Sequence, residues 1–439
     1  MKHSIAKDTI FMTIVDFILQ GITLLMNIFL TRKLGEEMLG VVSLVLSFYN
    51  TFVVISNGNS FLCANRFISE ERGKATGNAN TILMYSILWS AILSVSSTIL
   101  IVTFSDNICG KLLNNVEYSS GIKIIASTLV LTAMTSSIKG YFHAHRKVSI
   151  PLISGCIEFF VRNISIAIII YTFNTNVITM LSISILVGES TSMIFLFISL
   201  IKHLQQTNLL TDVSFKSYIV KSIPIALNSS IPLILSTCND ALLPITLRQC
   251  GSSAEQSFEL YGMFEAIVIP IIFFPSSILC SLSCIIVPEI ARCNTSRNYL
   301  RVRRVSFKAI RLTLIFSLMV SIGLFMFGDN LAILIGSTPF SGKIVKILSP
   351  VVPLIYLEIV LESILKGLGK HGFSSINYVA EYIVRISTLL ICVPLFHFYG
   401  IVISYYVSNI VGNISRIIKV SNVIPKDRKT VQGIVKTSY

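Results

Sequence analysis

Residues 149–172 read SIPLISGCIEFFVRNISIAIIIYT. A helix needs about 20 apolar residues to cross a bilayer, and this stretch has that length. It also carries two charges one helical turn apart, in Glu158-Phe-Phe-Val-Arg162. A second apolar run repeats the string as Glu381-Tyr-Ile-Val-Arg385, which predicts a membrane protein built from two similar halves.

The residues around the two strings extend the match. Ile138-Lys139-Gly140 precedes the first string and Leu365-Lys366-Gly367 precedes the second, while one span in each half opens with a glycine, Gly40 or Gly262. Short turns are expected at Arg32-Lys33-Leu34-Gly35 and at Phe398-Tyr399-Gly400. Counting apolar runs outward predicts twelve spans, at 10–31, 38–62, 79–104, 121–142, 149–172, 177–201, 218–246, 258–286, 307–328, 343–365, 373–396 and 398–418.

Two halves of six spans enter the membrane in the same direction. Parallel repeats of this kind are typical of secondary transporters, which hold the substrate between the halves and alternate access by rocking. We therefore expect an all-α polytopic membrane protein with two parallel six-helix bundles. The expected boundaries are 1–204 and 216–420 for the bundles, 205–215 for a cytoplasmic linker and 421–439 for a basic cytoplasmic tail.

The composition agrees with this architecture. Of the 439 residues, 53% are hydrophobic and only 13% are charged. A soluble domain carries roughly 25% charged residues, so the composition excludes a soluble enzyme, a disordered chain and a collagen-like repeat. The nine cysteines form no CxxC pair and no cluster with histidine at zinc spacing, so neither disulfides nor a metal site are expected.

The formal net charge of +14 reflects membrane topology. Most lysines and arginines fall in alternate loops, and the positive-inside rule then places both termini in the cytoplasm. Arg162 and Arg385 are the two arginines assigned to the interior of spans. The densest basic stretch, Arg292 to Arg311, is too short for a nucleic-acid-binding module, so we expect a surface helix held to anionic phospholipid there.

Charged side chains inside spans are costly, at roughly 2.5–3.5 kcal/mol each on insertion scales, so each suggests a role. Two interpretations of the repeated Glu/Arg strings stay open. Each glutamate and arginine can form an ion pair that locks helix packing. Alternatively the pairs face a central cavity, where Arg162 and Arg385 would bind a diphosphate in a bidentate fork. The expected cavity residues are Arg162, Arg385, Glu158, Glu381, Glu189, Asp16 and Gln20.

Other acidic residues receive separate interpretations. Glu362 has Lys366 one turn away and is expected to be structural. Asp16, with Gln20 and Asn27, gives the first span a polar side that suits a cavity wall or a proton or cation site.

Asp240 and Glu265 lie in neighbouring spans that contain several prolines. Interrupted helices free backbone carbonyls, which together with two carboxylates would hold a coupling cation such as Na⁺. The alternative interpretation is proline kinks at an outer mouth open to water. The prolines concerned are Pro224, Pro232, Pro244, Pro270 and Pro275.

Three strings resemble the MATE-like fold of the multidrug/oligosaccharidyl-lipid/polysaccharide flippase superfamily, and within it the polysaccharide exporter and stage V sporulation protein B branch. They are the turn from Leu30 to Gly40, the run from Leu260 through Pro270 and Pro275 to Ile290, and Lys139-Gly140 followed by Glu158 and Arg162. The resemblance covers most of the chain.

This resemblance implies a flippase in a bacterial cytoplasmic membrane that exports a lipid-linked oligosaccharide or other envelope polysaccharide precursor, as a monomer and without a cofactor other than a coupling Na⁺ or H⁺. Relatives in the lipid II flippase branch have arginines in the first span and fourteen spans, whereas this chain has Asp16 there and twelve expected spans. A cation-coupled exporter of amphipathic drugs therefore stays open. A glycosyltransferase is disfavoured because the short outer loops contain no DxD motif.

Overall fold

The computed structural model describes residues 2–72, 79–172, 176–203, 214–335 and 337–424. Every regular element in these ranges is helical, as predicted. Within them, eleven helical segments are long and apolar enough to cross a membrane. The first of these, Phe17–Glu71, contains most of the span predicted at 10–31 and all of the span predicted at 38–62, which accounts for the difference from twelve.

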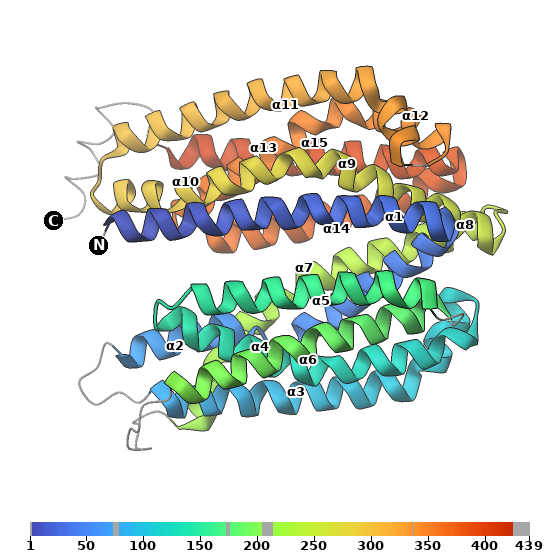
Figure 1. Cartoon of the computed structure of the whole chain (residues 1–439). Coiled ribbons are helices and arrows are strands. Elements are labelled where there is room, and N and C mark those ends of the chain that lie inside the picture. Colours follow the sequence, from blue (N-terminus) through green and yellow to red (C-terminus); the bar gives the residue numbers. More distant parts are fainter. Residues whose placement is uncertain (1, 73–78, 173–175, 204–213, 336, 425–439) are drawn as a thin grey trace. The chain divides into compact units, whose positions relative to one another are not determined.

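The helices of the first half match the predicted spans closely (Figure 1). The span predicted at 149–172 is α5 with the same bounds. The helices are α1 (Lys2–Asn57), α2 (Ser60–Arg72), α3 (Ala79–Ile108), α4 (Ser119–Ala144), α5 (Ser149–Thr172), α6 (Val177–His203) and α7 (Phe215–Gln249), with a π-helical η1 (Cys109–Leu113) and a 3-10 helical η2 (Val116–Tyr118) between α3 and α4.

The second half is more segmented. Its elements are α8 (Ala254–Gly262), the π-helical η3 (Met263–Val268), α9 (Ile269–Phe273), η4 (Phe274–Ser276), α10 (Ser277–Thr295), α11 (Tyr299–Ile335), α12 (Pro339–Leu348), η5 (Ser349–Val351), α13 (Val352–Gly367), α14 (His371–Phe396) and α15 (Phe398–Val423).

Two predicted turns can be compared with the structure. Gly35 has φ 80° and ψ 168°, which interrupts α1 inside the predicted Arg32–Gly35 turn. This backbone conformation suits glycine because it has no Cβ. A short turn joins the last two spans as predicted, but it lies at His397 (φ 51°) and not at Phe398–Gly400, because Phe398 already begins α15.

The prolines act differently in the two neighbouring spans. The interruption expected in the span at 218–246 is wrong, because α7 runs unbroken from Phe215 to Gln249 through its prolines. The span at 258–286 is interrupted as expected: Glu265 lies in η3, and Pro270 and Pro275 lie at the starts of the short segments α9 and η4.

Contacts divide the chain into a first unit, residues 41–241, and a second unit, residues 1–40 and 242–439. This grouping differs from the expected bundles 1–204 and 216–420 at the first and seventh spans. Hydrogen bonds give the reason for the seventh span, because Ser47 and Thr51 of α1 bond to Asp240 and Thr237 of α7. The expected linker and tail lie outside the described residues at 205–213 and 425–439.

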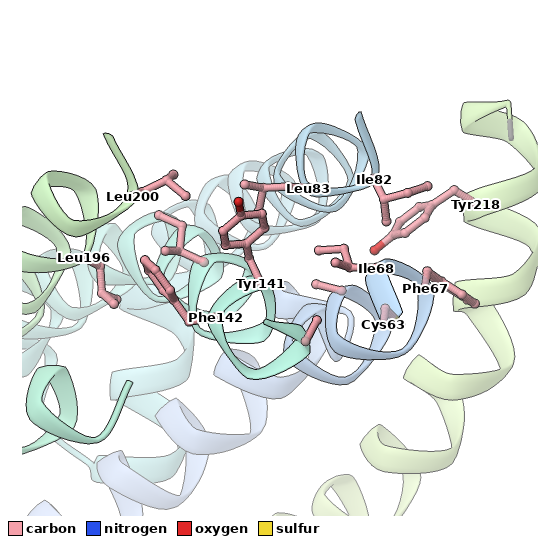
Figure 2. Close-up of a cluster of buried hydrophobic side chains, with 13 residues drawn as sticks. Cys63, Phe67, Ile68, Ile82, Leu83, Tyr141, Phe142, Leu196, Leu200 and Tyr218 are labelled. Carbon is pink, nitrogen blue, oxygen red and sulfur yellow. The ribbon is translucent and has the colours of Figure 1, made fainter. Parts of the chain in front are cut away.

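The first unit has an apolar core between α2, α3, α4, α6 and α7 (Figure 2). Phe142 and Ile68 are completely buried in it. Tyr218 extends from α7 toward Phe67 and Ile82, and its ring meets the Phe67 ring edge-on at 5.3 Å. This core fixes one end of α4 and α6, the helices that flank α5.

In the second unit, two glycines allow α1 and α8 to touch through their backbones. A Cβ added at Gly262 would lie 2.0 Å from the Glu36 carbonyl oxygen, and one added at Gly40 would lie 2.1 Å from the Phe258 carbonyl oxygen. No side chain fits at such distances. The two glycines that open spans in the sequence therefore mark one helix crossing.

The basic stretch Arg292 to Arg311 forms no separate surface helix. Arg292 belongs to the last turn of α10, and residues 299–311 are the beginning of the spanning helix α11. Glu289 pairs with both Arg292 and Arg301 at 2.7 Å. A single carboxylate thus ties the two helices together and neutralises part of the basic stretch.

Candidate functional site

The repeated glutamate of the second half belongs to a buried ion network. Arg416 of α15 is fully buried and lies between three carboxylates from α13 and α14. Its Nη1 donates to Glu381 Oε2 at 3.0 Å and its Nη2 donates to Glu358 Oε1 at 2.7 Å. Its Nε lies 3.7 Å from Glu362 Oε2. We call these residues, with Arg385, the Arg416 network.

Arg385 forms the expected pair with Glu381, at 3.2 Å from Nη2 to Oε1. Its Nε donates to Ser408 Oγ at 3.0 Å. The guanidinium carbon also lies 4.4 Å from the centroid of the Tyr405 ring and 5.0 Å from that of Tyr382, which are cation–π distances. The ion pair predicted between Glu381 and Arg385 is therefore present in this half.

The Arg416 network is close to neutral. Three carboxylates face two guanidiniums, and Lys366 lies 3.4 Å from Glu362 at the exposed edge, as predicted for that pair. Ser374 also donates to Glu362. Buried charges that are paired in this way cross-link helices. Arg416 Nε and Glu362 Oε2 form an ion pair at 3.7 Å without a hydrogen bond. The guanidinium of Arg385 is held by Glu381, Ser408 and two tyrosine rings within this network.

Arg416 is not among the residues predicted from the sequence for the site, although it lies near the end of the span predicted at 398–418. The arginine lies inside α15 and is 0% exposed, so a third buried arginine must be added to the two predicted. A polar stripe at helical spacing would have revealed it: Ser404, Ser408, Asn409, Gly412 and Asn413 precede it on one face, and all are buried.

The repeated string of the first half lies in a different setting. Glu158 of α5 pairs with Lys139 of α4 at 3.4 Å, and the two side chains are 21% and 23% exposed. Arg162 is also partly exposed, and its guanidinium carbon lies 5.9 Å from the centroid of the Phe159 ring. Within the described part of the chain, no ion pair joins Arg162 to Glu158. The self-neutralising pair predicted for this half is therefore wrong.

Glu189 completes this group from α6. Gly188 brings the α6 backbone against α5, because a Cβ there would lie 3.0 Å from the Glu158 carbonyl oxygen and 3.1 Å from Arg162 Cβ. Glu189 is 8% exposed and lies within electrostatic reach of Glu158, Lys139 and Arg162. We call these four residues the Glu158 cluster; it holds two positive and two negative groups and is the more open of the two sites.

The expected cation site divides between the two units. Asp240 accepts a hydrogen bond from Ser47 at 2.6 Å within the first unit, whereas Glu265 lies in η3 of the second unit. Their pairing around a cation stays a prediction. Among the described residues, no group of three or more histidine, cysteine, aspartate or glutamate side chains has the geometry of a metal site.

The polar residues predicted in the first span are only partly described. Gln20 is exposed, and Asn27 Nδ2 donates to the Ala266 carbonyl at 3.5 Å within the second unit. The side chain of Asp16 lies outside the described residues, so its role in a cavity or in ion coupling stays a prediction.

Eleven apolar helical segments within the described residues and two clusters of charged side chains are typical of a multi-pass membrane transporter. Comparison with known proteins identifies the family. The model of the polysaccharide biosynthesis protein family matches residues 5–294, so the chain belongs to this family, as the resemblance implied.

Two curated relatives are similar over most of the chain. Stage V sporulation protein B of Bacillus subtilis (strain 168) is 19% identical over 403 residues, which are 89% of this chain and 78% of that protein. Sporulation protein YkvU of the same organism is 21% identical over 396 residues, 88% of this chain and 87% of that protein.

Solved structures with the same fold are MATE transporters. An inward-facing multidrug resistance MATE family transporter superposes with a TM-score of 0.74 at 16% identity, over 95% of this chain and 98% of that one. The MATE multidrug transporter DinF-BH gives a TM-score of 0.73 at 14% identity, over 94% of both chains. These similarities confirm the MATE-like fold.

Proposed function

We propose that this protein is a flippase that moves a lipid-linked oligosaccharide, or another envelope polysaccharide precursor, across the cytoplasmic membrane by alternating access. Family membership supports a polysaccharide precursor as cargo. Both curated relatives are named as sporulation proteins, and we take this as support for a role in making the cell envelope. The positive-inside distribution of lysine and arginine supports a topology with both termini in the cytoplasm.

The observation that carries the proposal is the asymmetry between the repeated arginines. Arg385 is enclosed by Glu381, Ser408 and two tyrosine rings, whereas Arg162 is partly exposed and has no carboxylate partner among the described residues. A guanidinium can donate two parallel hydrogen bonds to the oxygens of a phosphate. Arg162 is therefore the proposed contact for the diphosphate of the lipid carrier.

The test is flipping of a labelled lipid-diphosphate oligosaccharide in proteoliposomes. Arg162→Gln is expected to abolish flipping, while the variant still inserts and elutes as a folded protein. Lys147→Gln provides the control, because Lys147 is an exposed cation near the start of α5 in the same unit. Unchanged flipping by Arg162→Gln would refute the assignment of this residue.

Arg385→Gln distinguishes the two arginines. Because Arg385 supports the Arg416 network, its loss is expected to lower the unfolding temperature, and the remaining folded protein is expected to keep flipping. Folded Arg385→Gln protein without flipping activity would instead return Arg385 to the cavity set.

A second candidate function is an H⁺- or Na⁺-coupled exporter of amphipathic drugs. Glu189 favours it, because this buried carboxylate has an oxygen, Oε2, with no hydrogen-bond partner within the described structure. A carboxylate in that position can carry a proton during transport. The solved multidrug transporters share the fold, which makes this second function structurally possible.

This alternative predicts that a cationic drug collapses an imposed ion gradient in proteoliposomes. Glu189→Gln, Asp16→Asn, Asp240→Asn and Glu265→Gln test the four proposed coupling carboxylates separately. A gradient that no cationic drug dissipates would remove this candidate, whereas drug-dependent dissipation lost in one variant would identify the coupling residue.

A further inference from the structure

The second unit has a groove that the proposed transport path does not use. It lies between α11, α13 and α15, and α13 contacts both of the other helices within this unit (Figure 1). Its volume is about 510 Å³, within the range of small-molecule pockets. The wall is mainly aliphatic and aromatic, with Phe307, Ile310 and Leu314 from α11, Leu357 and Leu361 from α13, and Ile417 from α15. A long apolar groove of this kind fits an acyl chain.

One end of the groove is positively charged. Among its lining residues, all within the described part of the chain, Arg303 is the only charged one. Its guanidinium carbon lies 5.7 Å from the centroid of the Phe307 ring, which places the charge beside the apolar wall. The exposed side chains of Arg304, Lys308 and Arg311 follow on the same helix and make the surrounding surface cationic.

A buried hydroxyl also lines the groove. Ser306 is 0% exposed, and its Oγ has no hydrogen-bond partner among the described residues. A buried polar atom without a partner is costly, and a ligand oxygen would satisfy it. Ser306 lies one helical turn from Arg303, so a phosphate or ester oxygen held by the arginine is the kind of group that would reach it.

We propose that this groove binds an anionic glycerophospholipid, with an acyl chain along the apolar wall and the phosphate at Arg303 and Ser306. Charge complementarity selects an anionic headgroup over a zwitterionic one. The basic end of α11 is the end that the positive-inside rule assigns to the cytoplasm, where the leaflet is anionic. The proposal locates at one groove the lipid contact expected for the basic stretch as a whole, and it does not depend on which cargo is transported.

The experiment uses the full chain reconstituted in bilayers. Trp89 is the only tryptophan, so Trp89→Phe combined with Phe307→Trp gives a reporter in the groove wall. Quenching by brominated phosphatidylglycerol and by brominated phosphatidylcholine then yields the ratio of the two association constants. We expect phosphatidylglycerol to be preferred about fivefold, the effect of roughly one basic residue near an anionic lipid.

Two neighbouring arginines separate a specific site from general surface charge. Arg303→Gln is expected to abolish the preference, whereas Arg304→Gln, one residue further along α11 and not in the groove wall, is expected to retain most of it. Ser306→Ala is expected to reduce the preference while leaving the fold intact, because it removes only a hydroxyl.

Three results would overturn the proposal. The reporter protein could show equal quenching by the two lipids, or Arg303→Gln and Arg304→Gln could lose the preference equally. A polyprenyl phosphate could also displace brominated phosphatidylglycerol at equal mole fraction, which would make the occupant a carrier lipid and not a membrane phospholipid.

Discussion

Arg416 Nη1 lies 3.0 Å from Glu381 Oε2, and the two side chains are 0% and 3% exposed. The repeated glutamate of the second half is thus paired with an arginine from the last spanning helix. Glu158, which holds the matching place in the first half, pairs with Lys139 and stays partly exposed. The two halves share a sequence string, but only the second half buries both of its charged side chains.

Loss of Arg416 is expected to destabilise the protein strongly. Arg416→Leu leaves Glu358, Glu362 and Glu381 without their shared partner, and breaking a buried ion pair costs about 3–5 kcal/mol. Thermal unfolding in detergent micelles measures the effect. Lys366→Gln is the control, because its pair with Glu362 is half exposed and contributes about 1 kcal/mol or less. Equal losses in the two variants would contradict the structural role of the network.

The two repeated glutamates are expected to differ in stability effect. Glu381→Gln removes a carboxylate that two buried arginines share, so a loss of about 3–5 kcal/mol is expected. Glu158→Gln removes one partly exposed pair, and about 1 kcal/mol is expected. A lower unfolding temperature for Glu158→Gln than for Glu381→Gln would contradict the stronger stabilising role of Glu381.

Gly412 is expected to be intolerant of any side chain. A Cβ there would lie 2.5 Å from Glu381 Oε2 and 2.9 Å from Arg416 Nη1, so Gly412→Ala pushes the network apart. The matched control is Gly155→Ala on α5, where nothing lies within 4 Å of the added atom. That control should be neutral or stabilising by about 0.5–1 kcal/mol, since alanine favours a helix over glycine. The measurement compares the thermal unfolding midpoints of Gly412→Ala and Gly155→Ala. Similar midpoints would argue against tight packing at Gly412.

The crossing of α1 and α8 is expected to be less tolerant than Gly412. Gly40→Ala and Gly262→Ala each place a Cβ about 2 Å from a backbone carbonyl oxygen, at Phe258 and Glu36 respectively, and backbone cannot move aside as a flexible side chain does. Both variants should reduce the yield of folded protein in membranes, measured by fluorescence-detected size exclusion. Gly323→Ala, with open space around its Cβ, should leave the yield unchanged. Wild-type yields from both crossing variants would show that the helices can separate without penalty.

Much of the fold was predictable because spans are long and their signal is additive. The span predicted at 149–172 matches α5 at both ends, and those at 177–201 and 373–396 agree with α6 and α14 within two residues at each end. The turn at Gly35 was also predictable, since a basic and glycine-containing break between two apolar runs leaves few alternatives. The continuity of α7 was not, because a proline breaks a helix only where no neighbouring group satisfies the freed carbonyl.

The candidate site was only half predictable. Sequence repetition located Glu158, Arg162, Glu381 and Arg385 on matching helices, since an i,i+4 spacing puts a glutamate and an arginine on one face. The repetition did not show in which string the glutamate and the arginine would form an ion pair with each other. Arg416 was missed because charge counting near the end of a span cannot separate a loop arginine from a buried one.

The sequence by itself therefore determined the membrane location, the helices and their duplication, because these depend on hydropathy and spacing within single segments. Only the tertiary structure decided which of the two repeated arginines is paired with a carboxylate. That choice depends on a third helix, α15, whose Gly412 leaves room for Arg416 to reach Glu381. Contacts between segments far apart in the chain control whether a charge cross-links the core or remains accessible to a substrate.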